Sequence, residues 1–514
     1  MSNKNTIPNI PAEKFRFVGD EGRLHDQKFE TKQISYFRDA FNRFCKNKSS
    51  VVAAIIIIFL VIYSIFVPIL CQTNYSSRLT DTTYLQYGKL LPKWNLIANL
   101  NLGFWDGCSE QSLGEANFLA VKAIGEETGF DVIKGEPVVT TDEKGKPLYT
   151  SRIDSYISNG FVYMTLSQSE YEAIQNWQNE TGIQIIYPAI DDKKQTDANI
   201  WYKTNKKGAA VLSKQGEFVD VYRTKGNDGD YYSLRVEGDP GLTDPEAENR
   251  YRYAHVTGDS SSISYKCRVF KYTYFQYRYG HEAEFIFGTN DLGQDILTRL
   301  AAGAQFSFIL AICVSAVNLF IGAVYGAVEG YYGGAIDMAM ERFVEILGRM
   351  PFMVVATLFQ LHLAKKVGAV GSLFFAFILT GWIGMAGTVR MQFYRFKGQE
   401  YVLAARTLGA KDSRIMFRHI FPNSLGTIVT SSVLVIPGVI FSESSLTYLG
   451  IVNLESSTMT SVGTMLANGR QFLSSYPHII LFPALFISLL MISFNLFGNG
   501  LRDAFNPSLR GSED

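Results

Sequence analysis

The residue types and spacings that carry catalysis or nucleotide binding do not occur in this sequence. The six histidines, at positions 25, 255, 281, 362, 419 and 478, are scattered without the spacing of a metal site. The sequence also contains no GxxxxGKS or GxxxxGKT phosphate loop, no GxSxG turn and no HExxH helix. We therefore expect a protein that is not an enzyme and that binds no cofactor or metal of its own.

A loop at residues 390–423 offers a surface for docking instead of a site for chemistry. Val402, Ala405 and Leu408, with Ala404 alongside, are predicted to form a small-residue face on a short helix. Such a helix presents its backbone for close approach to a groove on another protein. A solvated linker explains the same spacing equally well.

The end of this short helix is also marked in the sequence. Gly409 stands where a left-handed cap would end the helix. Asp412 is predicted to cap a second helix that runs to Pro422. The residues proposed to contact a partner are Glu400, Ala404, Ala405, Arg406, Gly409, Asp412 and Pro422.

Polar side chains interrupt one apolar stretch, residues 425–447. Glu443 lies near its end, after a predicted kink at Pro437, and an ionised group in a bilayer is costly unless it is paired or wet. The hydroxyl residues that accompany it are Thr427, Thr430, Ser431 and Ser442. These five residues are candidates for a substrate pathway or gate, although hydroxyls that bond to their own helix backbone explain the row equally well.

The composition places these groups in a membrane protein. Of 514 residues, 19% are charged and 47% are apolar, yet the mean hydropathy is +0.04, as expected when strongly apolar and polar parts are averaged. Apolar stretches long enough to cross a bilayer as helices lie near residues 51–71, 304–326, 343–364, 370–389, 425–447 and 478–498. This excludes a soluble protein, and the zero net charge excludes a generally basic nucleic-acid binder.

The distribution of basic residues predicts the orientation. Residues 31–50 are basic, and so is the loop 390–423, which the count of crossings places on the same side. By the positive-inside rule both lie in the cytoplasm. We therefore expect a multi-pass cell-membrane protein with cytoplasmic N- and C-termini, a cytoplasmic tail at 1–50 and an extracellular segment at 72–282.

The tail ends in a predicted amphipathic helix. Ile34, Phe37, Phe41 and Phe44 are spaced by three, four and three residues and form one apolar stripe. A helix of this kind lies among the lipid headgroups. Packing against another protein surface is the alternative.

The long polar segment 72–282 is predicted to be an α+β domain inserted between the first two spans. Gly160 to Leu166 is typical of a strand, and Ser167 with Glu170 forms a capping box for a helix through Thr181. Further predicted strands cover Ile183–Tyr187, Glu217–Tyr222 and Ser264–Tyr279.

Two cysteines fall within this domain. If the domain is extracellular, Cys108 and Cys267 could form a disulfide that contributes roughly 5 kcal/mol on the chain-entropy argument.

The loop 390–423 resembles a loop that is characteristic of one transporter family. Ala404, Ala405, Gly409 and Pro422 match the "EAA" loop of ABC-importer permeases, which inserts a coupling helix into the ATPase subunits. Leu403 stands where that family has a glutamate.

The rest of residues 283–514 resembles the dipeptide and oligopeptide permeases within that family. Phe287 to Arg299 is similar to their GTDxxGRDxxSR signature, through Gly288, Thr289, Gly293, Asp295 and Arg299. The segment Glu443–Gly450 is similar to ESxLSFLG, and Gly500–Pro507 resembles the closing GLRDxxDP. Asn290, Gln294, Thr298 and Gln305 depart from the signature.

The resemblance implies a fold and a set of partners. The fold would be the six-helix type I ABC importer permease fold, all-α apart from the inserted domain. The partners would be a second, homologous permease, two ABC ATPase subunits that bind ATP and Mg²⁺, an extracellular solute-binding protein and a peptide substrate. A membrane receptor with an extracellular ligand-binding domain is the rival interpretation of the same large insert.

Overall fold

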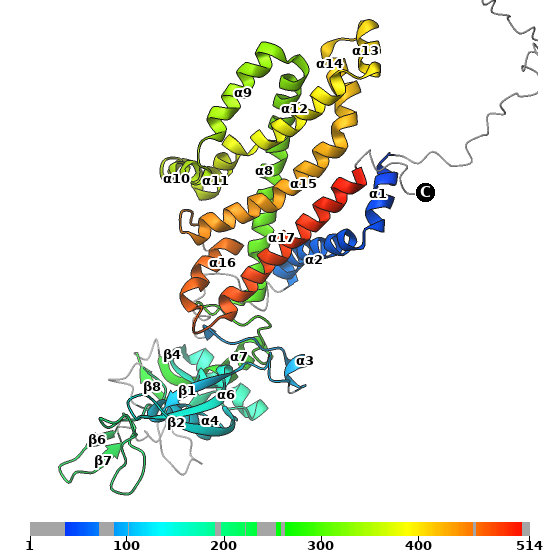
Figure 1. Cartoon of the computed structure of the whole chain (residues 1–514). Helices are drawn as coiled ribbons and strands as arrows, with labels where there is room; N and C mark the ends of the chain where they lie inside the picture. Colours follow the sequence, from blue (N-terminus) through cyan, green and yellow to red (C-terminus); the bar gives the residue numbers. More distant parts are fainter. Residues whose placement is uncertain are drawn as a thin grey trace, which may run out of the picture.

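The computed structural model describes residues 36–70, 87–100, 102–190, 197–221, 223–233, 253–258, 263–455 and 459–505. The chain has a helical part and an α+β part, which lie at opposite ends of the molecule in Figure 1. Ile34 of the predicted amphipathic helix lies outside the described residues.

The helical part contains the long apolar helices. Its first elements are α1 (Tyr36–Lys46), α2 (Lys48–Leu70), α8 (Ile296–Tyr332), α9 (Gly334–Gly348), α10 (Phe352–His362), α11 (Ala364–Gly381) and α12 (Ile383–Lys397). They are followed by α13 (Glu400–Thr407), α14 (Asp412–Arg414), the π-helical turn η3 (Ile415–Ile420), α15 (Phe421–Tyr448), α16 (Val462–Gly469), the 3-10 turn η4 (Arg470–Phe472) and α17 (His478–Phe505). Within the described residues five helices are long and apolar enough to cross a membrane, and a sixth span is formed if one bent pair counts as a span.

That bent pair corrects the predicted span 343–364. Helix α9 ends at Gly348, α10 begins at Phe352, and the two are bent by 73°. Pro351 stands at the N-cap of α10, where it has no N–H to extend the hydrogen bonds of α9. With 11 residues α10 is too short to cross alone, so the predicted straight helix is instead a broken span or a re-entrant loop.

Several other spans are longer than predicted. The predicted 370–389 lies within a helical stretch from Ala364 to Lys397, in which Gly368 has a non-helical backbone with φ 80°. Helix α8 has 37 residues, and at 1.5 Å per residue it is about 55 Å long, well beyond the roughly 30 Å of the hydrocarbon core. One end of α8 therefore extends out of the membrane.

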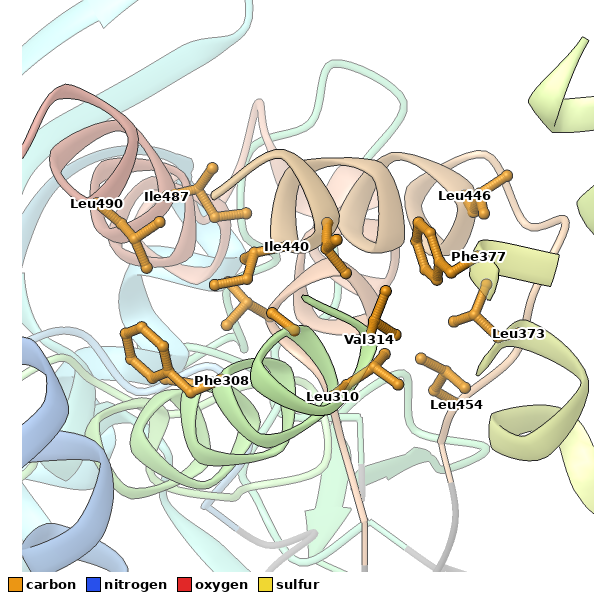
Figure 2. Close-up of a cluster of buried hydrophobic side chains, with 14 of the residues drawn as sticks. Phe308, Leu310, Val314, Leu373, Phe377, Ile440, Leu446, Leu454, Ile487 and Leu490 are labelled. Atoms are coloured by element: carbon orange, nitrogen blue, oxygen red, sulfur yellow. The ribbon is translucent and has the colours of Figure 1, made fainter. Parts of the chain in front are cut away.

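The core of the helical part lies where four of these helices meet. Figure 2 shows side chains from α8, α11, α15 and α17 pointing toward one another. The labelled residues of these helices are Phe308, Leu310, Val314, Leu373, Phe377, Ile440, Leu446, Ile487 and Leu490, and Leu454 joins them from the segment after α15. Because all of them are buried, this cluster fixes α15 and α17 against α8.

Helix α1 packs against α17. Phe44 is buried and meets Phe497 of α17 edge to face, with ring centroids 5.4 Å apart, while Phe41 is exposed. The predicted single apolar stripe is therefore divided, since one aromatic ring contacts protein and the other remains free to face lipid.

The α+β part contains nine strands among the described residues. Its helices are α3 (Asn95–Ala98), α4 (Glu115–Thr128), α5 (Ser155–Ser158), α6 (Gln168–Thr181) and α7 (Lys271–Tyr279). The strands are β1 (Cys108–Gly114), β2 (Ile133–Thr141), β3 (Pro147–Asp154), β4 (Phe161–Ser167), β5 (Ile186–Tyr187), β6 (Arg223–Lys225), β7 (Tyr231–Ser233), β8 (Ala254–Thr257) and β9 (Ser264–Phe270).

These strands form antiparallel sheets. One has the order β1-β3-β2, a second the order β4-β9-β5 with β8 also paired to β9, and β6 pairs with β7. The predicted strand at 160–166 and the helix through Thr181 are confirmed, including the capping box of Ser167 and Glu170. The expected mixture of helices and strands in this segment is therefore present.

Two of the predicted strands are wrong. Ser264–Tyr279 is a strand only to Phe270 and then the helix α7, whose central residues Tyr274 and Phe275 are buried in two different hydrophobic clusters. The aromatic residues that favour a strand here continue from β9 into α7, so their enrichment does not mark where the strand ends and the helix begins. In Glu217–Tyr222 the described residues form isolated bridges and no named strand.

The predicted disulfide is also absent. Cys108 and Cys267 are both free thiols, and they lie in different sheets, on β1 and β9. Cys267 is fully buried in an apolar cluster. Burial raises the pKa of each thiol to about 12, which disfavours the thiolate that disulfide exchange requires.

Candidate functional site

Helix α13 stands at the end of the molecule farthest from the α+β part (Figure 1). It begins at Glu400, after an extended Gln399, and has only eight residues. One side chain holds it in place, because Val402 is 0% exposed and packs in a cluster with Phe393 and Ile415. The short helix is thus fixed to α12 and η3 by one apolar anchor.

The end of α13 has the geometry that the sequence predicts. Gly409 has φ +80° and donates its N–H to the Arg406 carbonyl oxygen at 3.0 Å. A Cβ at this position would meet no atom within 4 Å. Glycine is therefore needed for the left-handed backbone and not for lack of space.

Asp412 does not act as the predicted helix cap. The N-cap of α14 is Lys411, and Asp412 is the first helical residue. Its Oδ1 instead accepts a hydrogen bond of 2.6 Å from the hydroxyl of Tyr331, at the end of α8. The Tyr331 hydroxyl in turn accepts a hydrogen bond of 3.4 Å from Arg406. These three side chains connect α13 and α14 to the end of α8.

The second helix does not end at Pro422 as predicted. The helical path continues from Asp412 through η3 into α15 and ends at Tyr448. Pro422 lies at the start of α15, where a proline without an N–H is tolerated, and the π-helical turn precedes it. As a result, a force on α14 acts directly on a membrane-spanning helix.

The outer face of α13 and η3 carries uncovered apolar side chains. Leu408 is 88% exposed, and Leu403 and Phe417 are also exposed. Ala404 is exposed and Ala405 is half-buried, so the predicted face of Val402, Ala405 and Leu408 is divided between core and solvent. Leu403 and Phe417 were not among the predicted contact residues, although apolar residues within a basic loop are a signal for a contact surface.

Beneath this loop a cluster of charges ties three helices together. Arg390 of α12 forms two bonds to the carboxylate of Asp337 on α9, at 2.6 and 3.1 Å, and its Nε lies 3.3 Å from a Glu329 oxygen on α8. Tyr394 also donates to Asp337, at 2.6 Å. The two-pronged guanidinium contact fixes orientation as well as distance, so α8, α9 and α12 are held as one unit below α13.

The polar residues of α15 point in two directions. Glu443 is fully buried, and its Oε2 accepts a 3.0 Å hydrogen bond from Ser307 on α8. Thr430 is also buried and bonds to the Gly426 carbonyl at 2.7 Å. Glu443 therefore joins α15 to α8, whereas the Thr430 hydroxyl bonds to the backbone of its own helix, and both side chains are turned away from a pathway.

Three of the predicted pathway residues share another face of α15. Thr427 is exposed, and Ser431 and Ser442 are half-buried. Their positions along a helix of 3.6 residues per turn place them on one side, together with the exposed Gly438. This face remains available to line a pathway.

The signature residues 287–299 hold the α+β part onto the helices. The Thr289 hydroxyl accepts from the Leu90 N–H at 2.8 Å and donates to the Tyr87 carbonyl at 2.6 Å. Gly288 has φ +76°, and a Cβ there would lie 2.5 Å from the Leu90 carbonyl oxygen. Residues 87–93 thus form a strap along 285–290, completed by the bond from the Lys93 N–H to the Phe285 carbonyl at 2.8 Å.

The second half of the signature begins α8. Asp295 caps the helix by accepting from the N–H groups of Leu297 and Thr298, at 3.3 and 3.0 Å. Gly293 has φ +77° in the preceding turn. Arg299 is buried and pairs with Glu455 at 3.0 Å. These residues set where α8 starts and what precedes it.

Comparison with known proteins decides the family. Residues 319–511 match the binding-protein-dependent transport system inner membrane component family, and residues 35–92 match the N-terminal TM domain of oligopeptide transport permease C. The chain is 42% identical to the oligopeptide transport system permease protein OppC of Bacillus subtilis over 224 residues, which is 44% of this chain and 72% of that protein. The chain belongs to the peptide ABC importer permease family.

Other relatives agree. The dipeptide transport system permease protein DppC of Bacillus subtilis is 39% identical over 229 residues, which is 44% of this chain and 70% of that protein. Among solved structures, an inward-facing form of the MetNI methionine ABC transporter covers 40% of this chain at 16% identity with a TM-score of 0.31. The family matches and the peptide permease relatives show that this chain is a multi-pass membrane protein and a subunit of a peptide ABC importer.

The two family matches leave residues 93–318 between them, and most of the α+β part falls in this range. The structure shows the segments on either side of the α+β part held against each other by the signature residues, since the Thr289 N–H donates to the Leu90 carbonyl at 3.0 Å. In this permease the insert is therefore joined to the helices at a structurally defined point.

Proposed function

We propose that α13 is the coupling helix through which ATPase subunits drive this permease. The observation that carries the proposal is the contrast on one short helix, where Val402 is buried in the permease and Leu408 is almost fully exposed at the tip. Together with the exposed Leu403 and Phe417, Leu408 forms an apolar surface within a basic loop, and such a surface supports a docking role. This chain contributes no ATP site, and ATP and Mg²⁺ bind the partner ATPases.

The proposed mechanism transmits motion through three connections. The first connection joins α13 and α14 to α8 through the hydrogen bonds of Tyr331 with Arg406 and Asp412. The second is the continuous helical path from Asp412 into α15. The third is the cluster around Arg390, which joins the helices beneath α13. Closure of two ATPases on ATP would displace α13 as a rigid piece. The displacement would tilt α8 and α15 together, because Glu443 and Ser307 tie them within the membrane.

The proposed orientation places α13 and both termini in the cytoplasm. The loop around α13 is basic, in agreement with the positive-inside rule. The packing of α1 on α17 supports termini on a shared side, since Ala40 and Phe44 form one buried cluster with Ala504. The α+β part at the opposite end would then be extracellular.

The proposed assembly has a second permease, two ATPases and an extracellular solute-binding protein. The face of α15 with Thr427, Ser431 and Ser442 would line half of the peptide pathway, and the second permease would supply the other half. The binding protein would deliver the peptide at the outer side, where the α+β part stands.

Reconstituted uptake tests this proposal. Gly409→Arg and Ala405→Glu place a large charge on the docking face, and each is expected to abolish ATP-driven uptake of peptide while the permease stays folded. Gly182→Arg is the matched control, because Gly182 also has a left-handed backbone, with φ +71°, and open space, but caps α6 in the insert. Unchanged uptake by both loop variants would refute the coupling role.

A further inference from the structure

A cavity of about 690 Å³ lies where the α+β part meets the membrane helices. Its walls come from the strap at Gly88 to Pro92, from β1, α4 and α5 of the insert, and from Ser475 to His478 just before and at the start of α17. This volume is within the range of pockets that hold small ligands. The cavity is separate from the coupling loop and from the face of α15.

The cavity carries one charge of each sign. Lys89 comes from the strap, and Glu110 comes from β1. Within the described residues neither side chain forms an ion pair with a protein group. A site with one free ammonium and one free carboxylate is complementary to a ligand that carries both charges.

The position of Lys89 is fixed by its surroundings. Its backbone has φ +63°, and its N–H donates to the Asn290 carbonyl at 2.8 Å. Its Nζ lies 4.6 Å from the centre of the Phe472 ring and 5.7 Å from that of Tyr476. The two rings hold the ammonium in place without neutralising it, so it remains able to bind an anion.

The remaining walls suit the middle of a short peptide. Leu113, Val121 and Ile153 provide apolar surface, and the partly exposed Trp201 provides an aromatic face. Such surfaces contact side chains of varied sequence without selecting one. The charges would therefore bind the two ends of a peptide while the walls tolerate different residues between them.

The floor of the cavity connects to the helices. His478, the first residue of α17, donates from Nε2 to the Thr289 carbonyl at 3.3 Å. Thr289 belongs to the signature that precedes α8. A ligand in the cavity thus lies against the start of α17, and the hydrogen bond of His478 connects that position to the signature that precedes α8.

We propose that this cavity is a binding site for a short peptide with free termini, in which Lys89 binds the α-carboxylate and Glu110 binds the α-ammonium. This inference rests on the proposed function, because it requires the α+β part to face the side from which peptide is delivered. The insert then gives the permease a peptide site of its own, ahead of the membrane pathway.

Equilibrium binding to the intact complex of permeases and ATPases, without the binding protein, tests the site. The probes are radiolabelled tri-alanine, its C-terminal amide and its N-acetyl derivative. Wild type is expected to prefer tri-alanine over each blocked form by about tenfold or more, the usual effect of losing a hydrogen bond to a charged group. Lys89→Met should bind the acid and the amide alike, and Glu110→Gln should bind the free and the acetylated amine alike.

Glu143→Gln and Lys144→Met are the matched controls, since both residues are exposed in the turn between β2 and β3, away from the cavity. Each control should keep the preference of wild type. The inference is overturned if tri-alanine does not bind saturably, or if both cavity variants still discriminate between free and blocked termini. ATP-driven uptake with the binding protein is measured in parallel. If only the cavity proposal is wrong, wild type still takes up peptide. If wild type takes up no peptide, the proposed function is refuted.

Discussion

Replacing Leu408 with alanine separates docking from folding. The Leu408 side chain is 88% exposed, so its removal leaves the packing of the permease unchanged. If an ATPase covers it in the complex, the truncation loses about 2 kcal/mol of apolar burial per docking site. That loss corresponds to roughly 30-fold weaker binding of the ATPase.

Replacing Val402 with alanine is expected to lower the stability of the permease, which Leu408→Ala should not do. Val402 is 0% exposed, and Val402→Ala removes buried methyl groups from the cluster that anchors α13. We expect a cost of about 1–3 kcal/mol in the stability of that cluster and a lower melting temperature of the permease. Leu408→Ala should leave the melting temperature unchanged.

The assay measures ATPase binding to permease pairs in nanodiscs by interferometry, with thermal unfolding followed by fluorescence. Leu212→Ala is the control, because Leu212 is exposed in the insert. The reasoning is refuted if Leu408→Ala binds the ATPase as tightly as wild type, or if it melts at a lower temperature. Unchanged binding would mean that Leu408 has no partner in the ATPase, and a lower melting temperature would mean that it packs within the permease.

Three further predictions concern the α+β part and its junction. Burial lowers the pKa of Lys271 to about 8, while its Nζ donates to Asn159 at 3.0 Å. The folded state therefore binds this proton less tightly than the unfolded chain, so the free energy of unfolding should rise between about pH 8 and 10. Unfolding experiments across that range should show the rise in wild type and not in Lys271→Met. Thr289→Val leaves a buried N–H and carbonyl of the strap without their partner and should cost about 1–3 kcal/mol, seen as earlier protease cleavage near residue 90 than in wild type. Because Cys108 and Cys267 are free, dithiothreitol should not change the melting temperature of the wild-type protein, and a drop would indicate that the disulfide forms after all.

The sequence alone was sufficient for the membrane helices and for the end of α13. Long apolar runs predict spans because the bilayer sets their length, and Gly409 marks a left-handed position that few other residues adopt. The break between α9 and α10 was missed, although Gly348 and Pro351 mark it, because the apolar residues on both sides of the break were taken as one span. An apolar composition shows that a segment is kept away from water, but it does not show where the helix bends.

Roles that depend on a distant partner could not be predicted. Asp412 has the residue type and position of a cap, but Tyr331, far away in the sequence, takes its carboxylate. Glu443 was grouped with Thr427 because both are polar in one span, whereas the fold turns the first toward Ser307 and leaves the second exposed. In each case tertiary contacts decide between alternatives that local spacing allows.

The most direct test of the central claim is site-specific photocrosslinking from position 408 in the reconstituted, transporting importer. A photoreactive amino acid at Leu408 is expected to give an adduct with the mass of permease plus one ATPase subunit, while the same group at Leu212 gives none. Active transport without any ATPase adduct from position 408 would contradict the claim that the ATPase binds the permease at α13.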